Sequence, residues 1–300
     1  MSDEFNSARS IKGYITRNPG ILTIHTGTSL KSDLHYSRMK KAIDHFVNTT
    51  LAKGIDGLRQ EFVQLQKTKK PDFSEYRAWA QHPSCNRYTG IYCIDKTRIV
   101  IEGHPDKMDY INANYVSSPL SEKRWICTQA PLPNTVYDFW LMVFEQKAIV
   151  ILQLCQFIEN NQEKCAMYYP KNEGEEVFYK DIRIKCVTVE LLGTPGKVVQ
   201  RIFNVHKRNN GKDIYHLAVG NWPDHGVPEP DVTLLKVLQK VRICLNSPII
   251  VHCSAGIGRT GTIVAIENIL ESFLQGRKTN VYDTVVKIRQ ERVQSVQKES

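Results

Sequence analysis

A cysteine and an arginine, six positions apart, form the clearest chemical pattern in the sequence. Cys253 follows the apolar, β-branched run 249–251, which predicts a buried strand. Arg259 opens a segment whose apolar residues recur at helical spacing. The loop between the two consists of Ser254, Ala255, Gly256, Ile257 and Gly258. The sequence therefore predicts a thiol at the end of a strand and a guanidinium at the start of a helix.

This arrangement is suited to binding a tetrahedral oxyanion. Backbone N–H groups of a tight, glycine-containing loop can point at one centre, and a helix N-terminus adds unpaired donors and the positive end of its dipole. Arg259 can hold two phosphate oxygens with its planar fork. The same positive field is expected to stabilise Cys253 as a thiolate, which is a nucleophile for phosphoryl transfer.

Three other interpretations compete with this one. The dinucleotide-binding pattern G-x-G-x-x-G is matched by Gly256, Gly258 and Gly261. That site needs a further strand ending in an acid, but the segment around Asp283 reads as a helix start. The P-loop spacing is also present, yet Thr262 stands where that loop needs lysine. Finally, Cys253 could be a buried core thiol, the usual fate of a lone cysteine, although its spacing to Arg259 favours catalysis.

The run HCSAGIGRTGT, residues 252–262, closely resembles the signature loop of the protein tyrosine phosphatases. The resemblance implies hydrolysis of phosphotyrosine by two in-line displacements, in which Cys253 attacks phosphorus and Arg259 and the loop N–H groups hold the equatorial oxygens. It further implies that His252 orders the loop and tunes the thiol, and that Thr260 hydrogen-bonds the sulfur. Neither a metal nor another cofactor is expected.

The segment 221–228, NWPDHGVP, resembles the mobile acid loop of the same family. There Asp224 takes the role of the general acid that protonates the leaving tyrosyl oxygen, and Trp222 is the anchoring side chain. Near the end of the chain, Gln297 matches the glutamine that positions the hydrolytic water.

Two further segments resemble parts of the family's active site. Glu159 and Lys164 match in spacing an acid and a lysine that flank the site, and Glu159 is expected to pair with the arginine of the signature loop. Residues 86–91, NRYTGI, resemble the phosphotyrosine-recognition loop K-N-R-Y-x-D. Tyr88 inherits the role of stacking on the substrate ring in a deep pocket, which favours a tyrosine-specific over a dual-specificity enzyme. Gly90 replaces the aspartate that binds the substrate backbone, so weaker peptide binding is expected.

The resemblance implies one α/β domain: a highly twisted mixed β-sheet flanked by α-helices, with the cysteine phosphate-binding loop (residues 253–259) between a strand and a helix. Residues 46–300 are expected to form the catalytic domain, without the family's last helix, and residues 1–45 a flexible extension. Locally, Thr135 and Asp138 predict a capping box, and Asn210-Gly211 predicts a hairpin turn. Further helices are expected over 35–47, 56–66 and 231–245, from 259 to about 274, and after Asn280.

The composition narrows the class of protein. The 300-residue chain has a formal net charge of +9 and eight cysteines without a C-x-x-C pair, which argues against structural zinc and fits a reducing compartment. Without a long apolar run or a signal-peptide core, no transmembrane segment is expected, and the cytoplasm or nucleus is the expected location. No nucleic-acid motif accompanies the positive charge. The charge instead favours attraction of anionic phosphotyrosine-containing proteins, which are the expected partners. The protein is expected to be a monomer.

The main alternative function is a phosphotyrosine-binding module with weak or vestigial catalysis. Gly90 and the missing final segment favour it. The intact set of Cys253, Arg259 and Asp224 favours the enzyme.

Overall fold

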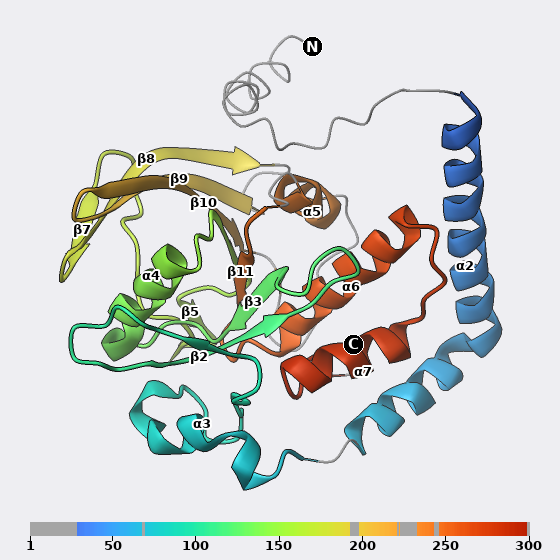
Figure 1. The fold of residues 1–300 in the computed structure, drawn as a ribbon, viewed down its shortest axis with the longest axis horizontal. Coiled ribbons are helices and arrows are strands. Elements are labelled where there is room, and N and C mark those ends of the chain that lie inside the picture. Colours follow the sequence, from blue (N-terminus) through green and yellow to red (C-terminus); the bar gives the residue numbers. More distant parts are fainter. Residues whose placement is uncertain are drawn as a thin grey trace.

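The computed structural model of the protein describes residues 29–67, 70–192, 198–220, 222, 233–242 and 246–298. Its centre is a mixed sheet of nine strands, with α4 (Val136–Glu145) on one side and α6 (Gly258–Leu274) on the other (Figure 1). In their order across the sheet, the strands are β1 (Arg98–Val100), β2 (Tyr110–Val116), β3 (Trp125–Thr128), β11 (Ile249–His252), β4 (Val150–Gln153), β10 (Asn210–Val219), β9 (Val198–Lys207), β8 (Ile182–Leu192) and β7 (Glu176–Tyr179). This architecture confirms the predicted α/β fold class.

The strand that leads to the cysteine, β11, lies between two parallel neighbours. Its register places His252 opposite Thr128 of β3 and Gln153 of β4. All four residues of β11 are buried, as expected for a parallel strand that is covered on both faces. The predicted order of strand, loop and helix is therefore present, and the loop leaves the sheet from a fully paired strand.

The capping box predicted for Thr135 and Asp138 is wrong. The Thr135 hydroxyl accepts a hydrogen bond from the backbone N–H of Leu132 at 2.9 Å and so belongs to the 3-10 turn before α4. Asp138 is 3% exposed, and its Oδ1 lies 3.1 Å from Nε2 of His104. A buried carboxylate needs a polar partner, and Asp138 finds it in this histidine instead of in the helix end.

β8, β9 and β10 form an antiparallel meander, but the predicted hairpin turn is wrongly placed. Lys207 pairs with Asn210, so the two residues between them make the turn, with Arg208 at φ 54°. Asn210 and Gly211 instead begin β10. Gly211 has a packing role there, because a Cβ would lie 2.4 Å from the ring of His206 on the opposite strand.

A long helix, α2 (Ser29–Gln66), runs beside α6 and α7 (Figure 1). Gly54 interrupts it with φ 63°, so α2 consists of two helical parts. Ala42 of the first part is 2% exposed and belongs to a cluster with Ile269 and Phe273 of α6.

This helix overlaps the predicted flexible extension 1–45. Residues 1–28 lie outside the described residues. From Ser29 onward the extension is helical, and the burial of Ala42 shows that this part is attached to the folded body. The predicted helices 35–47 and 56–66 are both segments of α2.

The predicted ends of the last two helices are confirmed. Asn280 caps α7 (Val281–Glu291) by accepting a hydrogen bond from the N–H of Asp283 at 2.8 Å. Gly276, with φ 64°, follows α6 and donates to the carbonyl of Phe273. The remaining elements are α3 (Arg77–Gln81), α5 (Thr233–Arg242), β5 (Ile158–Glu159), β6 (Gln162–Glu163) and the 3-10 turns Phe73–Glu75, Pro83–Cys85 and Pro133–Thr135. Among the helices in the described ranges, none is long and apolar enough to span a bilayer.

Candidate active site

The phosphate-binding loop wraps around the sulfur of Cys253. Cys253 is 3% exposed, and the backbone N–H of Gly256 donates a hydrogen bond to its Sγ at 3.3 Å. Gly256 has φ 71°, and a Cβ at this position would lie 2.2 Å from the carbonyl oxygen of Thr128. Glycine is the residue that tolerates both conditions, so Gly256 fixes the curvature of the loop around the thiol.

A buried arginine that the sequence interpretation left without a role supports this loop. Arg292 is 0% exposed, and its Nε and Nη2 donate to the carbonyl oxygens of Gly256 and Ala255, each at 3.2 Å. Its Nη1 donates to the side-chain oxygens of Asn112 and Asn114 on β2, each at 2.7 Å. Arg292 therefore links the loop to the sheet.

These contacts determine where the loop amides point. In a trans peptide, the N–H points away from the carbonyl of the same peptide unit. Because the carbonyls of residues 255 and 256 face Arg292, the N–H groups of Gly256 and Ile257 face away from it. The Gly256 N–H bond to Cys253 Sγ agrees with this direction. The loop thus offers amide donors on the side of the thiol, next to the N-terminus of α6.

Arg259 is held by the predicted ion pair. Its Nη1 and Nη2 donate to the two carboxylate oxygens of Glu159 at 2.6 and 2.8 Å, and Nη1 also donates to the carbonyl oxygen of Trp222 at 3.2 Å. Burial acts to lower the pKa of Arg259, but the hydrogen-bonded carboxylate of Glu159 outweighs it and raises the pKa. A permanently charged fork is therefore fixed at the start of α6.

Gln156 completes a ring of hydrogen bonds around this ion pair. Its backbone N–H donates to Oε1 of Glu159 at 2.9 Å, and its side-chain amide donates to the carbonyl of Gly220 at 2.8 Å. The carbonyls of Gly220 and Trp222 are thus bound by Gln156 and Arg259, respectively. No sequence signal marked Gln156, because its role depends on the approach of two distant segments.

Behind the cysteine lies a buried chain of rings. The Nδ1 of His252 lies 3.3 Å from the carbonyl oxygen of Cys253, and its Nε2 lies 2.8 Å from the hydroxyl of Tyr168. The same hydroxyl lies 2.9 Å from Nε2 of His216. Burial lowers the pKa of His252 to about 3 and also lowers the pKa of His216. At neutral pH, His252 is therefore an uncharged hydrogen-bonding group next to the loop.

A statistical model of the family described as protein-tyrosine phosphatase matches residues 82–300. The chain belongs to this family. Among curated relatives, the mouse (Mus musculus) receptor-type tyrosine-protein phosphatase C is 39% identical over 223 residues, which cover 72% of this chain and 17% of that protein. The human (Homo sapiens) tyrosine-protein phosphatase non-receptor type 9 is 34% identical over 274 residues, 85% of this chain and 46% of that protein. The chain therefore spans less than half the length of these relatives.

Solved structures of the family agree in fold. The crystal structure of the catalytic domain of human protein tyrosine phosphatase non-receptor type 18 aligns with a TM-score of 0.71 and 28% identity, covering 83% of this chain and 93% of that one. A structure described as PTPN18 in complex with HER2-pY1196 phosphopeptides aligns with a TM-score of 0.74 and 29% identity, covering 85% and 93%.

In this phosphatase-family chain, Tyr88 stands at the rim of the loop. It is 37% exposed, and its hydroxyl lies 2.8 Å from Oγ of Ser254, which in turn donates to the carbonyl of Lys164 at 3.1 Å. Arg87 anchors the recognition loop (residues 86–91) by donating to the carbonyl of Pro131 at 2.6 Å. The ring of Tyr88 is therefore positioned by the phosphate-binding loop itself.

Gly90, the departure from the family pattern, has space around it. A Cβ at Gly90 would meet no atom of the described residues within 4 Å, and the backbone has no left-handed φ that would favour glycine. Position 90 could thus carry an ordinary side chain, so the glycine is not explained by local backbone conformation.

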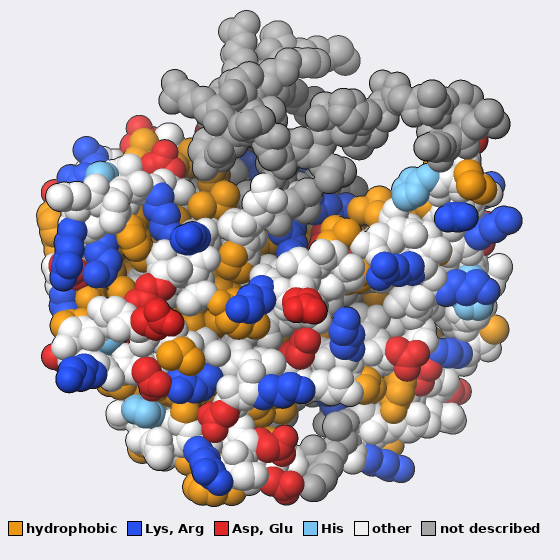
Figure 2. All heavy atoms as spheres, in the orientation of Figure 1, with side chains coloured by type: hydrophobic (Ala, Val, Ile, Leu, Met, Phe, Trp, Pro, Cys, Tyr) orange, Lys and Arg blue, Asp and Glu red, His pale blue; other side chains and the backbone are white. Residues whose placement is uncertain are grey.

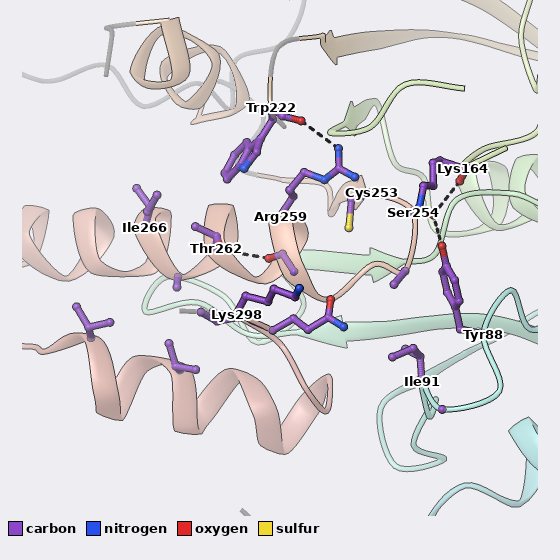
Figure 3. A pocket seen from close by; sticks show the side chains of 18 of the residues that line it. Tyr88, Ile91, Lys164, Trp222, Cys253, Ser254, Arg259, Thr262, Ile266 and Lys298 are labelled. Atoms are coloured by element: carbon purple, nitrogen blue, oxygen red, sulfur yellow. Dashed lines mark hydrogen bonds between the residues drawn. The ribbon is translucent and has the colours of Figure 1, made fainter. Parts of the chain in front are cut away.

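One cavity of about 600 Å³ joins most of the predicted site residues (Figure 3). Its lining includes Tyr88, Lys164, Trp222, Cys253, Ser254, Ala255, Gly258, Arg259 and Gln297. Tyr88 and Cys253 face the same space, with Arg259 beyond the sulfur. The remaining loop residues, Gly256 and Ile257, are not part of this lining.

One predicted contact of this site is absent, and one predicted residue is not described. Among the described residues, the buried hydroxyl of Thr260 has no hydrogen-bond partner, so the expected bond to the cysteine sulfur is absent. Asp224 lies outside the described residues, and its role as acid stays a prediction. Within the described ranges, no group of three or more His, Cys, Asp and Glu side chains is placed to hold a metal ion.

Proposed function

We propose that this protein is a protein-tyrosine-phosphatase enzyme that hydrolyses phosphotyrosine in proteins through a cysteinyl-phosphate intermediate. The observation that carries the proposal is the Cys253 sulfur enclosed by loop amides, beside the guanidinium of Arg259 that Glu159 fixes. Such donors stabilise the charge on the equatorial oxygens of a phosphoryl group in transfer, without reorganising during the reaction.

In the first displacement, the thiolate of Cys253 forms a bond to phosphorus while the bond between phosphorus and the tyrosyl oxygen breaks. Asp224 gives its proton to the leaving oxygen. In the second displacement, Gln297 positions a water molecule, Asp224 accepts a proton from it, and the cysteine leaves as thiolate. The placement of Gln297 in the lining of the cavity that contains Cys253 supports this role.

Tyr88 supports specificity for tyrosine. Its ring stands at the rim of the cavity, and the thiol is 3% exposed. A phosphoserine side chain is shorter than a phosphotyrosine side chain, so its phosphate would not reach as far toward the sulfur. Lys164 and the uncharged His252 are supporting groups, the first at the mouth and the second behind the loop.

The partners we propose are phosphotyrosine-containing proteins, and the location we propose is the cytoplasm, with a monomeric protein. On the face seen in Figure 2, basic side chains interleave with acidic ones instead of gathering in one patch. That distribution gives no support to nucleic acid as a partner. The net charge of +9 instead favours general attraction of anionic phosphopeptides.

The experiment that tests this function compares the wild-type protein with Cys253→Ser. Wild type should hydrolyse a phosphotyrosine peptide and leave the matched phosphoserine peptide almost untouched, whereas Cys253→Ser should bind the phosphotyrosine peptide without turnover. Binding without turnover by the wild type would instead favour the phosphotyrosine-binding module. Full activity of Cys253→Ser would exclude the proposed nucleophile.

A further inference from the structure

A chain of three buried polar side chains ends at the backbone of Cys253. His216 of β10, Tyr168 between β6 and β7, and His252 of β11 are each 0% exposed. Burial raises the pKa of Tyr168 and lowers the pKa of both histidines. At neutral pH each imidazole therefore carries one N–H and the phenol carries one O–H. With so few protons, each contact in the chain has a single donor that can be identified.

The contact nearest the phosphate-binding loop fixes the tautomer of His252. Its Nδ1 lies 3.3 Å from the carbonyl oxygen of Cys253. A carbonyl oxygen only accepts hydrogen bonds, so Nδ1 carries the proton. Nε2 of the uncharged ring is then an acceptor, and in its 2.8 Å contact with Tyr168 the hydroxyl is the donor.

A competing acceptor for the Tyr168 proton is already occupied. The hydroxyl also lies 3.3 Å from Oε1 of Gln153, which is longer than its contacts with the two histidines. That oxygen accepts a hydrogen bond from the hydroxyl of Tyr169 at 3.0 Å, and the side-chain nitrogen of Gln153 donates to the carbonyl of Cys155 at 2.8 Å. Because a phenol has one proton, the shorter contact with His252 takes it.

His216 is the donor of the remaining contact. Its Nε2 lies 2.9 Å from the Tyr168 oxygen, whose own proton points at His252. Without a proton on Nε2, two acceptors would face each other at this distance. The other ring nitrogen, Nδ1, is buried without a hydrogen-bond partner among the described residues, and a proton there would be a costly unpaired donor. The chain of donors therefore runs from His216 through Tyr168 and His252 to Cys253.

We propose that Tyr168 and His216 are positioning residues for the reaction, which hold His252 in its Nδ1–H form and align the hydrogen bonds of the chain toward Cys253. This inference rests on the proposed function and deepens it, because it assigns two further residues to the same thiol. Aligned hydrogen bonds polarise one another in a low-dielectric interior. Their positive ends point along the chain toward Cys253, so the chain favours the thiolate, whereas the opposite direction would disfavour it.

Other charged and titratable groups surround the chain. They are Arg87 and Arg259 near His252, Arg201 near His216 and Tyr168, and Tyr169, Cys155 and Cys165 near Tyr168. Tyr168→Phe keeps all of these groups and the aromatic ring. The variant therefore removes the central hydroxyl of the chain alone.

The test is the pH profile of carboxymethylation of Cys253 by iodoacetate, measured by mass spectrometry. The thiolate is the reactive species, so the midpoint of the profile reports how readily it forms. Tyr168→Phe should move the midpoint upward by roughly one pH unit, which is about the effect of one hydrogen bond. A downward move would mean that the chain runs the other way, and an unchanged midpoint would mean that it does not act on the thiol. Either result would overturn the proposal.

Tyr169→Phe is the matched control. Tyr169 is the next residue, is 3% exposed, and donates its hydroxyl hydrogen bond to Gln153 instead of to the chain. Its variant loses a buried hydroxyl in the same way, and the midpoint for Cys253 should not move. An equal shift in the two variants would assign the effect to loosened packing and contradict the chain.

Nitrogen-15 spectra of the histidine side chains test the chain in the wild-type protein, where no variant has to fold. The proton should lie on Nδ1 of His252 and on Nε2 of His216, and the opposite tautomer at either ring would overturn the proposal. The small aryl phosphate p-nitrophenyl phosphate and phosphotyrosine peptides test the proposed function separately. A wild-type protein that hydrolyses neither, but whose midpoint shifts as expected in Tyr168→Phe, would overturn the function and leave the chain standing.

Discussion

The phosphate-binding loop and the recognition loop line the same cavity but are held in different ways. The first follows a central strand, is buried, and is supported by Arg292, whose donors reach both the loop and the sheet. The second lies at the surface, with Tyr88 37% exposed and open space around Gly90. Chemistry in this molecule thus depends on a buried loop that is tied to the sheet, whereas recognition depends on a half-exposed ring and on an open position at Gly90.

The largest expected effect comes from Arg292→Met. The change leaves two side-chain oxygens and two loop carbonyls without their donor, at a cost of roughly 1–3 kcal/mol for each buried group that stays unpaired. We expect a loss of kcat of roughly a hundredfold or more, equal for phosphopeptides and p-nitrophenyl phosphate, because the amide donors lose their orientation.

Thermal unfolding and steady-state kinetics measure the two consequences. Arg277→Met, at an exposed arginine, is the control and should change neither. A loss confined to phosphopeptides would contradict the idea that Arg292 acts on the catalytic loop.

The second expected effect concerns pH and the buried ring next to the phosphate-binding loop. His252 has a pKa of about 3 in the folded protein, against about 6.5 in an unfolded chain. Between these values the unfolded chain binds more protons, so stability falls as the pH drops from about 6.5 toward 3. One such group contributes up to about 1.4 kcal/mol per pH unit.

Urea unfolding at neutral and at mildly acidic pH checks this slope. His252→Gln should make the dependence flatter, whereas His45→Gln, at an exposed histidine, should leave it unchanged. An identical slope in all three proteins would remove His252 from the explanation.

A smaller effect is expected at the rim. Tyr88→Ala should lower kcat/KM for a phosphotyrosine peptide by roughly tenfold, since an aromatic contact beyond its area is worth about 0.5–1.5 kcal/mol. Tyr88→Phe keeps the ring and loses only the hydroxyl contact with Ser254, so it should lose less. Equal losses in the two variants would assign the effect to the hydroxyl instead of to stacking.

The smallest effect is expected from a substitution that adds a hydrogen-bond acceptor to the recognition loop. Gly90→Asp should lower KM for phosphopeptides by roughly tenfold, because a carboxylate there can accept charge-assisted hydrogen bonds from the substrate backbone. The open space around position 90 accommodates the side chain. Gly90→Ala controls for stiffening of the loop, and p-nitrophenyl phosphate, which has no peptide backbone, should be unaffected. Improvement of both substrates together would count against the backbone contact.

The parts of the site that are contiguous in sequence were predictable. The run from Ile249 to Arg259 carries its own strand, loop and helix signals, and the structure places Cys253 where they indicate. The asparagine cap of α7 is likewise a local signal. These features depend on neighbours within a few residues, and composition and spacing report them directly.

Other features depend on contacts between distant segments, and local patterns gave no reliable signal for them. Gln156 reaches Gly220 across 64 positions, and Arg292 reaches Asn112 across 180. Asp138 fits a capping box by spacing, but a buried histidine competes for it. The hairpin turn was misplaced because Gly211 is not a turn residue. It lies in β10, where the ring of His206 on the paired strand leaves no room for a Cβ.

The burial of the thiols makes the molecule selective toward alkylating reagents. Seven cysteines of the described residues are free and buried, and among these seven Cys253 lines the cavity. A small anionic reagent such as iodoacetate suits a space that binds phosphate, whereas the neutral reagent iodoacetamide lacks the charge that the loop amides and Arg259 attract. Among these seven thiols, labelling under native conditions should therefore modify Cys253 alone, and the extent of carboxymethylation should equal the fraction of activity lost.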